Sequence, residues 1–350
     1  MITPTRRSLL VGAAATAAAL AAPAIAQTPG PLRSVRSTAK SWLWAVEDFA
    51  HGAGLFQRYG VVVESTSSGR GVNVDALISN AAEIVLGAPT QTMRVQMQNR
   101  PLKMIAGMVN KYASHIVVRK SILDRVGVTE ASPVDRKIAA LRGLKLGTTG
   151  PGAAPDSLIR WFLARANMNP DRDVELVTVQ GGGPALLAAF QREAIDGFCL
   201  SSPTSDVAVG RFGAAYLFNM SRNPPPELAD YLYIAVSVNE RSITERAAQL
   251  TAYCRALAAA QRDIAANPDA FKTWARGFFS DMDPALFEAS YAADGHIYMP
   301  DPRVNEQHFR LNVGFLDAEL KALGQPGVPP SFAYAQAYDM RLANEAMRSL

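Results

Sequence analysis

The stretch Ile195-Asp196-Gly197-Phe198-Cys199-Leu200-Ser201-Ser202-Pro203-Thr204 is a short apolar run followed by small residues, a proline and a threonine. An earlier stretch, Ala82-Glu83-Ile84-Val85-Leu86-Gly87-Ala88-Pro89-Thr90, has the same order of residue types. The two Pro-Thr pairs lie 114 residues apart (203 − 89 = 114). A short apolar run that ends in small residues and proline is typical of a buried strand leading into a loop. The two stretches therefore indicate equivalent strands of a repeated unit.

The residues on either side of these strands repeat as well. Before the first stretch, the sequence predicts a strand at 32–36, a loop at 37–41 and a helix to about 53, then a strand at 59–65 and a helix at 74–80. Before the second, it predicts a strand at 144–147, a loop at 148–152, a helix at 156–167 and a strand at 174–179, after which Gly181-Gly182-Gly183-Pro184 opens a helix. This repeated order predicts an α/β protein of two similar lobes, each a mainly parallel sheet flanked by helices.

Two further strands are expected to connect the lobes. Residues 115–119 leave the first lobe and residues 231–238 return to it, and the mostly helical remainder completes it. The predicted domains are 27–118 with 236–350 for lobe I, and 119–235 for lobe II. A double crossover predicts a hinge about which the lobes close, with a cleft at the carboxyl ends of the strands.

Composition limits the kinds of partner. The chain has 350 residues, 49% of them hydrophobic, two cysteines and a formal net charge of +4. Two cysteines exclude a disulfide scaffold and a cysteine-only zinc site. Lys and Arg are scattered, which argues against nucleic acid or a membrane surface as a partner. The longest helical pattern, at 244–267, is amphipathic, so no membrane span is expected in the mature chain.

The first 26 residues have the layout of an export signal. Thr5-Arg6-Arg7-Ser8-Leu9-Leu10 contains a twin-arginine pair, an alanine-rich run follows, and Ala24-Ile25-Ala26 has the small-residue ending of a cleavage site. These features predict a twin-arginine signal peptide at 1–26, cleavage after Ala26 and a periplasmic protein. An uncleaved N-terminal anchor is the alternative.

Four motifs resemble those of one family. They are Gly54-Leu55-Phe56-Gln57-Arg58-Tyr59-Gly60-Val61-Val62-Val63, Leu141-Arg142-Gly143-Leu144-Lys145-Leu146-Gly147, Ala194-Ile195-Asp196-Gly197 and Tyr338-Asp339-Met340-Arg341-Leu342-Ala343. In this order they are similar to the substrate-binding proteins of bacterial ABC importers for nitrate, sulfonates, taurine and thiamine-type pyrimidines. The chain departs from that pattern at Glu83, where the family has aspartate, and at Glu193, where it has glycine.

The resemblance implies a fold and a role. The fold would be the two-lobed type II periplasmic binding protein with two hinge crossovers. The role would be to bind a small-molecule ligand and deliver it to the permease and ATPase subunits of an importer. The resemblance further implies a monomer that needs no cofactor and performs no covalent chemistry.

Signatures of enzymes are weak in this sequence. Gly181-Gly182-Gly183 lacks the spacing of a dinucleotide-binding loop, no serine lies in a G-x-S-x-G elbow, and neither the four histidines nor the two cysteines have metal-ligand spacing. We therefore assign no catalytic residue and no metal ligand. An enzyme on the same fold, similar to a pyrimidine synthase or a lyase, stays an alternative, as does a periplasmic ligand sensor.

Ligand-binding residues are expected in the loops that follow strands and open helices, where backbone N–H groups are unpaired. Small and hydroxyl residues there suit close approach and hydrogen bonding, although ordinary helix capping uses the same residue types. The predicted set is Thr38, Lys40, Ser41, Trp42, Ala88, Thr90, Lys111 and Tyr112 in the first lobe, and Thr149, Gly150, Gly152, Gly182, Ser202 and Thr204 in the second.

Two lysines and a tryptophan in this set predict the ligand class. Lys40 and Lys111 would add positive charge to the helix ends, which favours an anionic head group. Trp42, rather than Trp44, is expected to face the cleft and contact a flat or apolar body, because it lies nearer the loop. The alternative is that both lysines are solvated and Trp44 belongs to the core.

Overall fold

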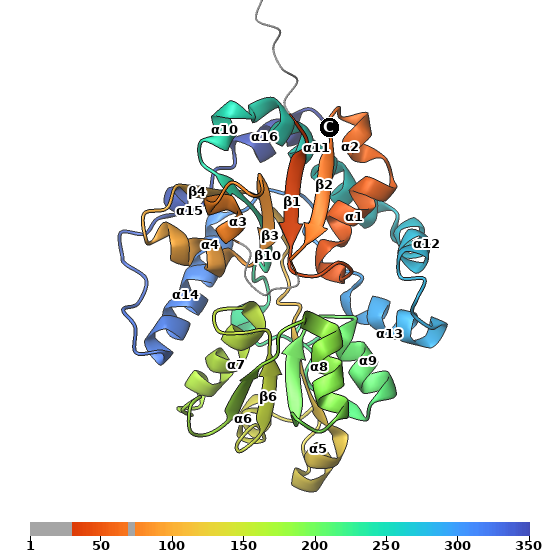
Figure 1. The fold of residues 1–350 in the computed structure, drawn as a ribbon, viewed down its shortest axis with the longest axis vertical. Coiled ribbons are helices and arrows are strands. Elements are labelled where there is room, and N and C mark those ends of the chain that lie inside the picture. The colour runs from red at the N-terminus through yellow and green to blue at the C-terminus, as the bar shows by residue number, and fades with distance from the viewer. Residues whose placement is uncertain (1–29, 69–73) are drawn as a thin grey trace, which may run out of the picture. The chain divides into compact units, whose positions relative to one another are not determined.

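Two five-stranded sheets organise the chain between Pro31 and Leu350 (Figure 1). The structure is a computed structural model, and it describes residues 30–68 and 74–350. The predicted signal peptide, with Arg6, Arg7 and the cleavage site after Ala26, lies outside the described residues.

The first sheet has the strand order β2-β1-β3-β10-β4. Its strands β1 and β2 pair in parallel, as do β1 and β3, whereas β10 pairs antiparallel with both β3 and β4. The strand bounds are Leu32–Arg36 for β1, Val63–Ser67 for β2, Ile84–Gly87 for β3, Leu102–Val109 for β4 and Ile234–Asn239 for β10.

The second sheet repeats this plan in the order β7-β6-β8-β5-β9. Strand β6 is parallel to β7 and β8, and β5 is antiparallel to β8 and β9. The bounds are His115–Arg119 for β5, Lys145–Thr148 for β6, Glu175–Thr178 for β7, Gly197–Leu200 for β8 and Ala214–Phe218 for β9. The matching topology confirms the predicted two-lobed repeat.

Both sheets are mainly parallel, as the sequence predicted, and each contains one antiparallel strand. That strand is the fourth in each sheet; it follows a crossover between the lobes and runs against its neighbours. Strand β5 pairs within the second sheet and β10 within the first, so the chain crosses at 110–114 and again at 219–233. The predicted boundaries after residues 118 and 235 fall inside these two strands.

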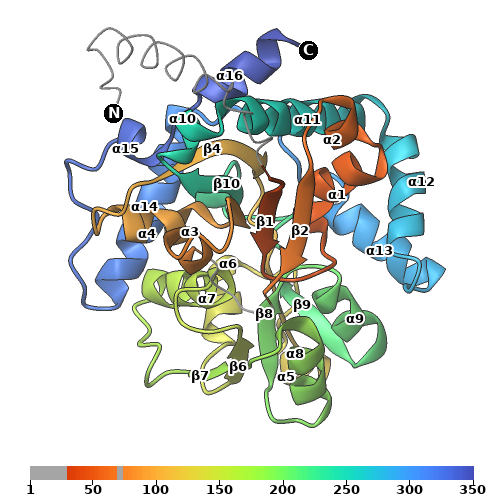
Figure 2. The same ribbon diagram turned by 45° about the horizontal axis from the view of Figure 1, so that its top comes forward.

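Helices cover both faces of the first sheet. On one face α1, α2, α11 and α16 share a core with β1 and β10, and on the other α4, α14 and α15 pack against β4 and β10. Figure 2 shows α11 running along the top of this sheet beside α16. The bounds are η1 Trp42–Trp44, α1 Ala45–Gly52, α2 Leu55–Arg58, α3 Asp75–Ile78, α4 Pro89–Gln96, α10 Ser242–Glu245, α11 Ala247–Ala266, α12 Pro268–Phe278, α13 Pro284–Asp294, α14 Glu306–Ala322, α15 Tyr334–Ala337 and α16 Arg341–Arg348.

The second sheet is flanked in the same way. Helices α8 and α9 cover one face, where Phe190 and Phe198 are buried, and α7 packs with α5 and α6 in the core that continues from the first lobe. The bounds are α5 Lys120–Val126, α6 Val134–Ala139, α7 Ala154–Arg165, α8 Gly182–Gln191, α9 Thr204–Arg211 and η2 Pro226–Leu228. No helix in residues 30–68 and 74–350 has the length and apolarity that a membrane span requires.

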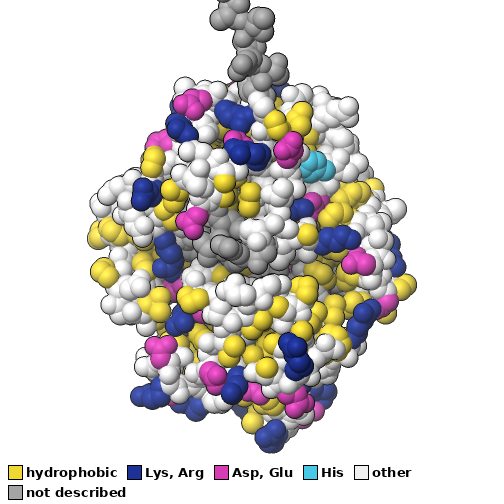
Figure 3. Space-filling model, viewed as in Figure 1, with side chains coloured by type: hydrophobic (Ala, Val, Ile, Leu, Met, Phe, Trp, Pro, Cys, Tyr) yellow, Lys and Arg dark blue, Asp and Glu magenta, His cyan; other side chains and the backbone are white. Residues whose placement is uncertain are grey.

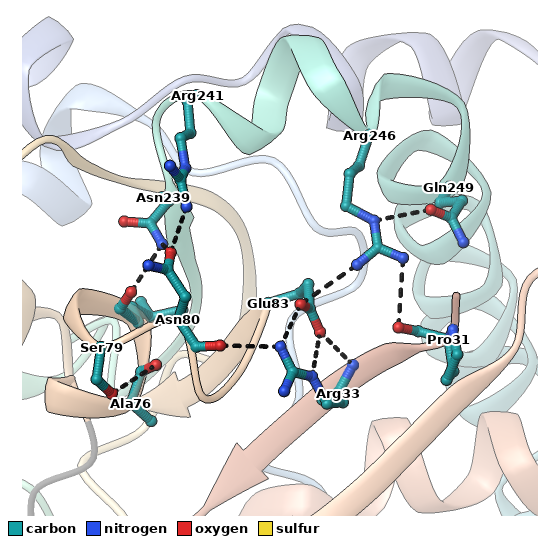
Figure 4. Close-up of polar contacts among 11 residues, drawn as sticks. Pro31, Arg33, Ala76, Ser79, Asn80, Glu83, Asn239, Arg241, Arg246 and Gln249 are labelled. Carbon is teal, nitrogen blue, oxygen red and sulfur yellow. Dashed lines mark hydrogen bonds and ion pairs between the residues drawn. The ribbon is translucent and has the colours of Figure 1, made fainter. Parts of the chain in front are cut away.

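The two departures from the family's motif pattern have local structural roles. Glu83 accepts hydrogen bonds from Arg33, at 2.7 Å to Nη2, and forms an ion pair with Arg246 at 3.4 Å (Figure 4). This network ties the start of β1 and the α3–β3 turn to α11. Glu193 adopts a φ of 59°, the left-handed conformation that glycine adopts most easily. Neither residue lines the cavity described below.

Charged side chains are spread over the surface. On the face in Figure 3, Lys and Arg alternate with Asp and Glu and with apolar side chains, and they form no continuous basic area. This agrees with the scattered charges of the sequence.

Gly197 on β8 lies where the backbone of β5 approaches it closely within the second sheet. A Cβ atom at this position would lie 2.4 Å from the carbonyl oxygen of Val117 on β5. We expect Gly197→Ala to lower the free energy of unfolding by about 1–3 kcal/mol in a urea titration, because the strands must move apart. Gly210→Ala in α9 is the control, since its Cβ would lie 3.6 Å from Leu286. Equal stability of the two variants would contradict the role of this close approach.

Candidate functional site

A cavity of about 60 Å³ lies between the lobes at the edge where strand ends meet. Residues after β1, β3, β6 and β8 reach it from the carboxyl ends of these parallel strands. Ser114 precedes β5, and Tyr233 and Ile234 begin the segment that returns through β10. Strands β5 and β10, which follow the two crossovers, run antiparallel to the other strands of their sheets. Their first residues therefore lie at the same edge as the carboxyl ends of the parallel strands, and this edge of each sheet forms the cavity.

The cavity has a polar and an apolar part. Its polar side chains are Ser37, Thr38, Gln91, Ser114, Thr149, Ser201 and Tyr233. Its apolar side chains are Leu43, Trp44, Leu86, Pro155, Leu200 and Ile234, and small residues at Gly87, Ala88, Ala154 and Gly182 complete the wall. Trp44 is fixed in place because its Nε1–H donates to Thr38 Oγ1 at 3.0 Å. None of these lining residues carries a charge.

Three helices begin at the cavity wall. Helix α4 follows Ala88, α7 begins at Ala154, and α8 begins at Gly182. In none of these three described helices does the N-cap side chain hydrogen-bond the first turn. Each first turn contains a proline, Pro89, Pro155 or Pro184, which has no N–H group, and the Gln91 N–H already bonds the Ala88 carbonyl oxygen. The helix ends therefore offer a hydrogen-bond acceptor the positive ends of their dipoles and the other N–H groups of these turns. Three such ends can bind an anionic or strongly accepting group without a charged side chain.

Contacts between the lobes close this cavity. Ser41 Oγ of the first lobe donates to the Ser202 carbonyl oxygen at 2.9 Å, and the Tyr112 hydroxyl donates to the Ala154 carbonyl oxygen at 2.7 Å. Gly182 lies opposite Thr38, with 3.8 Å between the Thr38 methyl and the place where a Cβ would be. The structure therefore represents the lobes in a closed arrangement.

The structure brings part of the predicted set to the cavity. Thr38, Ala88, Thr149 and Gly182 line it. Gly150 and Gly152 lie in the same loop as Thr149, with φ of 128° and 75°. The buried residues Ser41, Tyr112 and Ser202 take part in the contacts between the lobes. Thr90 is the second residue of α4 and Thr204 the first of α9, and neither is among the lining residues.

Both lysines lie away from the cavity lining. Lys40 Nζ pairs with Asp281 at 3.2 Å, and 44% of its side chain is exposed. Lys111 is half-buried and lies outside the lining. Within the lining, the helix ends rather than these two side chains are therefore the groups that would favour an anion.

The two tryptophans also lie differently from the prediction. Trp42 is fully buried, its Nε1–H donates to Ser290 Oγ at 2.6 Å, and its ring contacts Phe279 at 4.5 Å between centroids. Trp44 lines the cavity instead. These residues form a 3-10 helix, whose direction relative to α13 could not be read from their positions in the sequence.

Sequence reasoning did not single out several lining residues. Gly87 ends β3, Gln91 lies in the first turn of α4 and Ser201 follows β8. All three fall within the stretches 87–91 and 201–204 that the strand-end pattern indicates, although the predicted set names other residues there. Ser114 and Tyr233 come from the crossovers, where no local pattern marks a binding residue, and the Ser114 Oγ and Tyr233 hydroxyl are 2.6 Å apart.

A buried histidine–aspartate pair lies beside the site. His115 Nε2 is 3.0 Å from Asp294 Oδ2, and both side chains are fully buried. Burial opposes charge on both groups, yet their mutual attraction raises the pKa of His115 and lowers that of Asp294. The Met220 N–H donates to His115 Nδ1 at 3.2 Å, which requires the neutral ring whose Nε2–H donates to Asp294, so both ring nitrogens have partners within the fold. The pair joins α13 to β5. Within the described residues no group of three His, Cys, Asp or Glu side chains could hold a metal ion.

Two sheets of this topology joined by two crossovers form the two-lobed type II periplasmic binding protein fold. A protein from Bordetella bronchiseptica RB50 superposes with a TM-score of 0.74 at 18% identity, covering 92% of this chain and 98% of that one. The alkanesulfonate-binding protein SsuA from Xanthomonas axonopodis pv. citri, bound to MOPS, gives 0.67 at 15% identity, covering 92% and 99%. The nitrate-binding protein NrtA from Synechocystis gives 0.65 at 17% identity, covering 91% and 89%.

Sequence comparison gives the family. The NMT1-like family matches residues 48–276, and the chain belongs to this family. It is 28% identical over 164 residues to the bicarbonate transport ATP-binding protein CmpC of Synechocystis sp.. The aligned region covers 44% of this chain and 24% of that protein. It is 29% identical over 170 residues to the nitrate/nitrite binding protein NrtA of Synechococcus elongatus, covering 43% and 37%. The chain thus spans about a quarter to a third of these relatives' length.

Asp294 provides a test of the buried histidine–aspartate pair. We expect Asp294→Asn to lower the free energy of unfolding by roughly 3–5 kcal/mol at pH 7, because it removes one partner of a buried pair. The folded-state pKa of Asp294 lies below its ordinary value, so this stabilisation is present above about pH 4 and is lost as the pH falls through that lowered pKa.

The matched control lies on the same helix. Glu288 pairs with Lys272 at 2.6 Å, and 60% of the Glu288 side chain is exposed. Glu288→Gln should cost less than about 1 kcal/mol, as exposed pairs do. Urea unfolding at pH 7 and pH 3 measures both variants, and a small, pH-independent effect of Asp294→Asn would contradict the assignment.

Proposed function

We propose that the chain is an exported solute-binding protein that encloses a small solute between its lobes and delivers it to the permease and ATPase subunits of an ABC importer. The observation that carries the proposal is the uncharged cavity where three helix N-termini converge between two hinged lobes. Membership of the NMT1-like family and the likeness to sulfonate- and nitrate-binding proteins support it.

The lining residues support a ligand with two parts. A hydrogen-bond-accepting or singly anionic head group would meet the helix ends, Thr38, Thr149 and Ser201, and a short apolar body would contact Leu43, Trp44 and Leu86. A doubly charged anion is disfavoured because no lining side chain offers a compensating charge. The cavity's small volume favours a compact solute.

The lining gives little support to the enzyme alternative. Among the lining residues Tyr233 carries a titratable group, and burial raises the pKa of its hydroxyl well above the ordinary value. His115, the histidine nearest the crossover, uses both ring nitrogens in the fold. Capture of an intact solute is the chemistry that these residues favour.

A ligand panel tests the proposal. We expect a compact organic monoanion to bind at micromolar Kd or tighter, about −8 kcal/mol, in a calorimetric titration of the mature protein. The panel contains nitrate, bicarbonate, methanesulfonate, butanesulfonate, butyrate, benzoate and a neutral pyrimidine. Tight binding of nitrate or bicarbonate alone would contradict the apolar body, and binding of the neutral pyrimidine alone would contradict the anionic head.

Matched variants locate the binding energy of whichever panel member binds. Trp44→Phe should abolish most of the binding-induced change in tryptophan fluorescence, whereas Trp42→Phe should retain it, because Trp44 lines the cavity. The double variant Lys40→Ala, Lys111→Ala should bind within about twofold of the parent, since a charge outside the site contributes little. A tenfold loss in the lysine variant would return the anion-binding role to these side chains.

Export supplies a separate prediction. The mature protein should begin at Gln27, and replacing both Arg6 and Arg7 by lysine should block export while keeping the charge. N-terminal sequencing of periplasmic protein and cell fractionation measure the two effects. Retention of Met1 on the exported protein would contradict cleavage, and normal export of the double variant would contradict the twin-arginine route.

A further inference from the structure

One carboxylate joins helices from both lobes. Glu319 lies on α14 with its side chain fully buried, and its Oε2 is 2.6 Å from Arg94 Nη2 on α4 of the first lobe. Its other oxygen, Oε1, accepts a hydrogen bond of 2.8 Å from Ser157 Oγ on α7 of the second lobe. A carboxylate removed from water requires partners for its oxygens, and the partners here come from opposite sides of the cleft.

Both partner helices begin at the cavity. Arg94 lies on the helix whose first turn contributes Gln91 to the lining, and Ser157 follows Ala154 and Pro155 by one turn. Because an α-helix is stiff over this length, the distance between Arg94 and Ser157 sets the spacing of two of the three helix ends that face the ligand.

Apolar packing supports the same contact. Phe315, one turn before Glu319 on α14, stacks with Trp161, one turn after Ser157 on α7, at 6.0 Å and 19° between the rings. The two helices therefore meet through an i, i+4 pair from each side. Burial raises the pKa of Glu319 and Arg94 opposes this, so the carboxylate depends on its neighbours to stay ionised.

We propose that Glu319 is the positioning residue that holds the two lobes closed in the ligand-free protein and fixes the spacing of α4 and α7 at the cavity. The proposal rests on the binding role proposed above. Arg94 and Glu319 both lie on helices of the first lobe, whereas Ser157 lies on the second lobe, so a separation of the lobes would break the Ser157 hydrogen bond before the ion pair. This charge-assisted bond needs no solute, so it favours the closed form before binding and reduces the reorganisation that binding requires.

The experiment measures the distance between the lobes without added solute. Val62 in the first lobe and Val126 in the second are 66% and 47% exposed, whereas Cys199 and Cys254 are buried. Spin labels on a Val62→Cys, Val126→Cys variant of the mature protein therefore report lobe separation by pulsed electron resonance. We expect one predominant short distance in this parent. Ser157→Ala should shift the ratio of closed to open forms about tenfold toward a longer distance, as loss of a hydrogen bond to a charged group predicts.

Ser34 provides a control variant that distinguishes an effect on the distance between the lobes from an effect on stability alone. Ser34 Oγ donates to Glu47 Oε2 at 2.9 Å, and both residues are buried within the first lobe. Ser34→Ala removes the same kind of bond without touching lobe II, so its distance distribution should equal that of the parent even where its thermal stability falls. Glu319→Gln keeps the side-chain shape and should also populate the longer distance.

The outcomes decide between the alternatives. Parent-like distances in both Ser157→Ala and Glu319→Gln would overturn the proposal, as would a parent that shows only the longer distance without solute. Because no solute is present, the result is independent of the ligand panel. Failure of every panel member to bind would contradict the proposed function while leaving the lobe measurement interpretable.

Discussion

The rest of the structure depends on the two antiparallel strands, β5 and β10, with which the chain enters each sheet after crossing between the lobes. Each sheet is completed by a strand that enters after a crossover and runs antiparallel to its neighbours. The first residues of β5 and β10 therefore lie beside the carboxyl ends of the parallel strands. This arrangement brings the βα loops of both lobes to one cavity and leaves the crossovers as the covalent hinge between the sheets.

Charges are kept out of the cavity lining and paired within its walls. Glu319 with Arg94, and His115 with Asp294, are buried pairs that connect helices of the C-terminal region to the strands and helices around the site. Such pairs contribute little net stability, but each is costly to break, because a single buried charge would remain. Their role here is to hold the helices that they join in fixed positions relative to one another. The backbone groups and hydroxyls of the cavity wall are therefore held in set positions.

The repeat was readable from sequence because it is a local property. Apolar runs that end in small residues and proline, at 84–90 and 195–204, mark equivalent strands, and the structure places both at the same position in their sheets. The loops that follow parallel strands must meet at one edge, so a general prediction of the site was possible. Thr38, Ala88, Thr149 and Gly182 belong to such loops and do line the cavity. Ser114 and Tyr233 belong to crossovers, whose course depends on both sheets, and no local pattern marked them.

The sequence by itself determined the two-lobed α/β plan, the crossovers and the loops that supply the site, because strand periodicity and turn chemistry act over a few residues. Tertiary structure decided which side chains within those loops face the cavity. Trp42 is drawn into the aromatic cluster of α12 and α13, and Lys40 turns to Asp281, through partners more than 200 residues away in the chain. Glu319 acquires its place between the lobes only when α14 packs against α4 and α7. Side-chain direction depends on such distant packing, and a linear pattern carries no information about it.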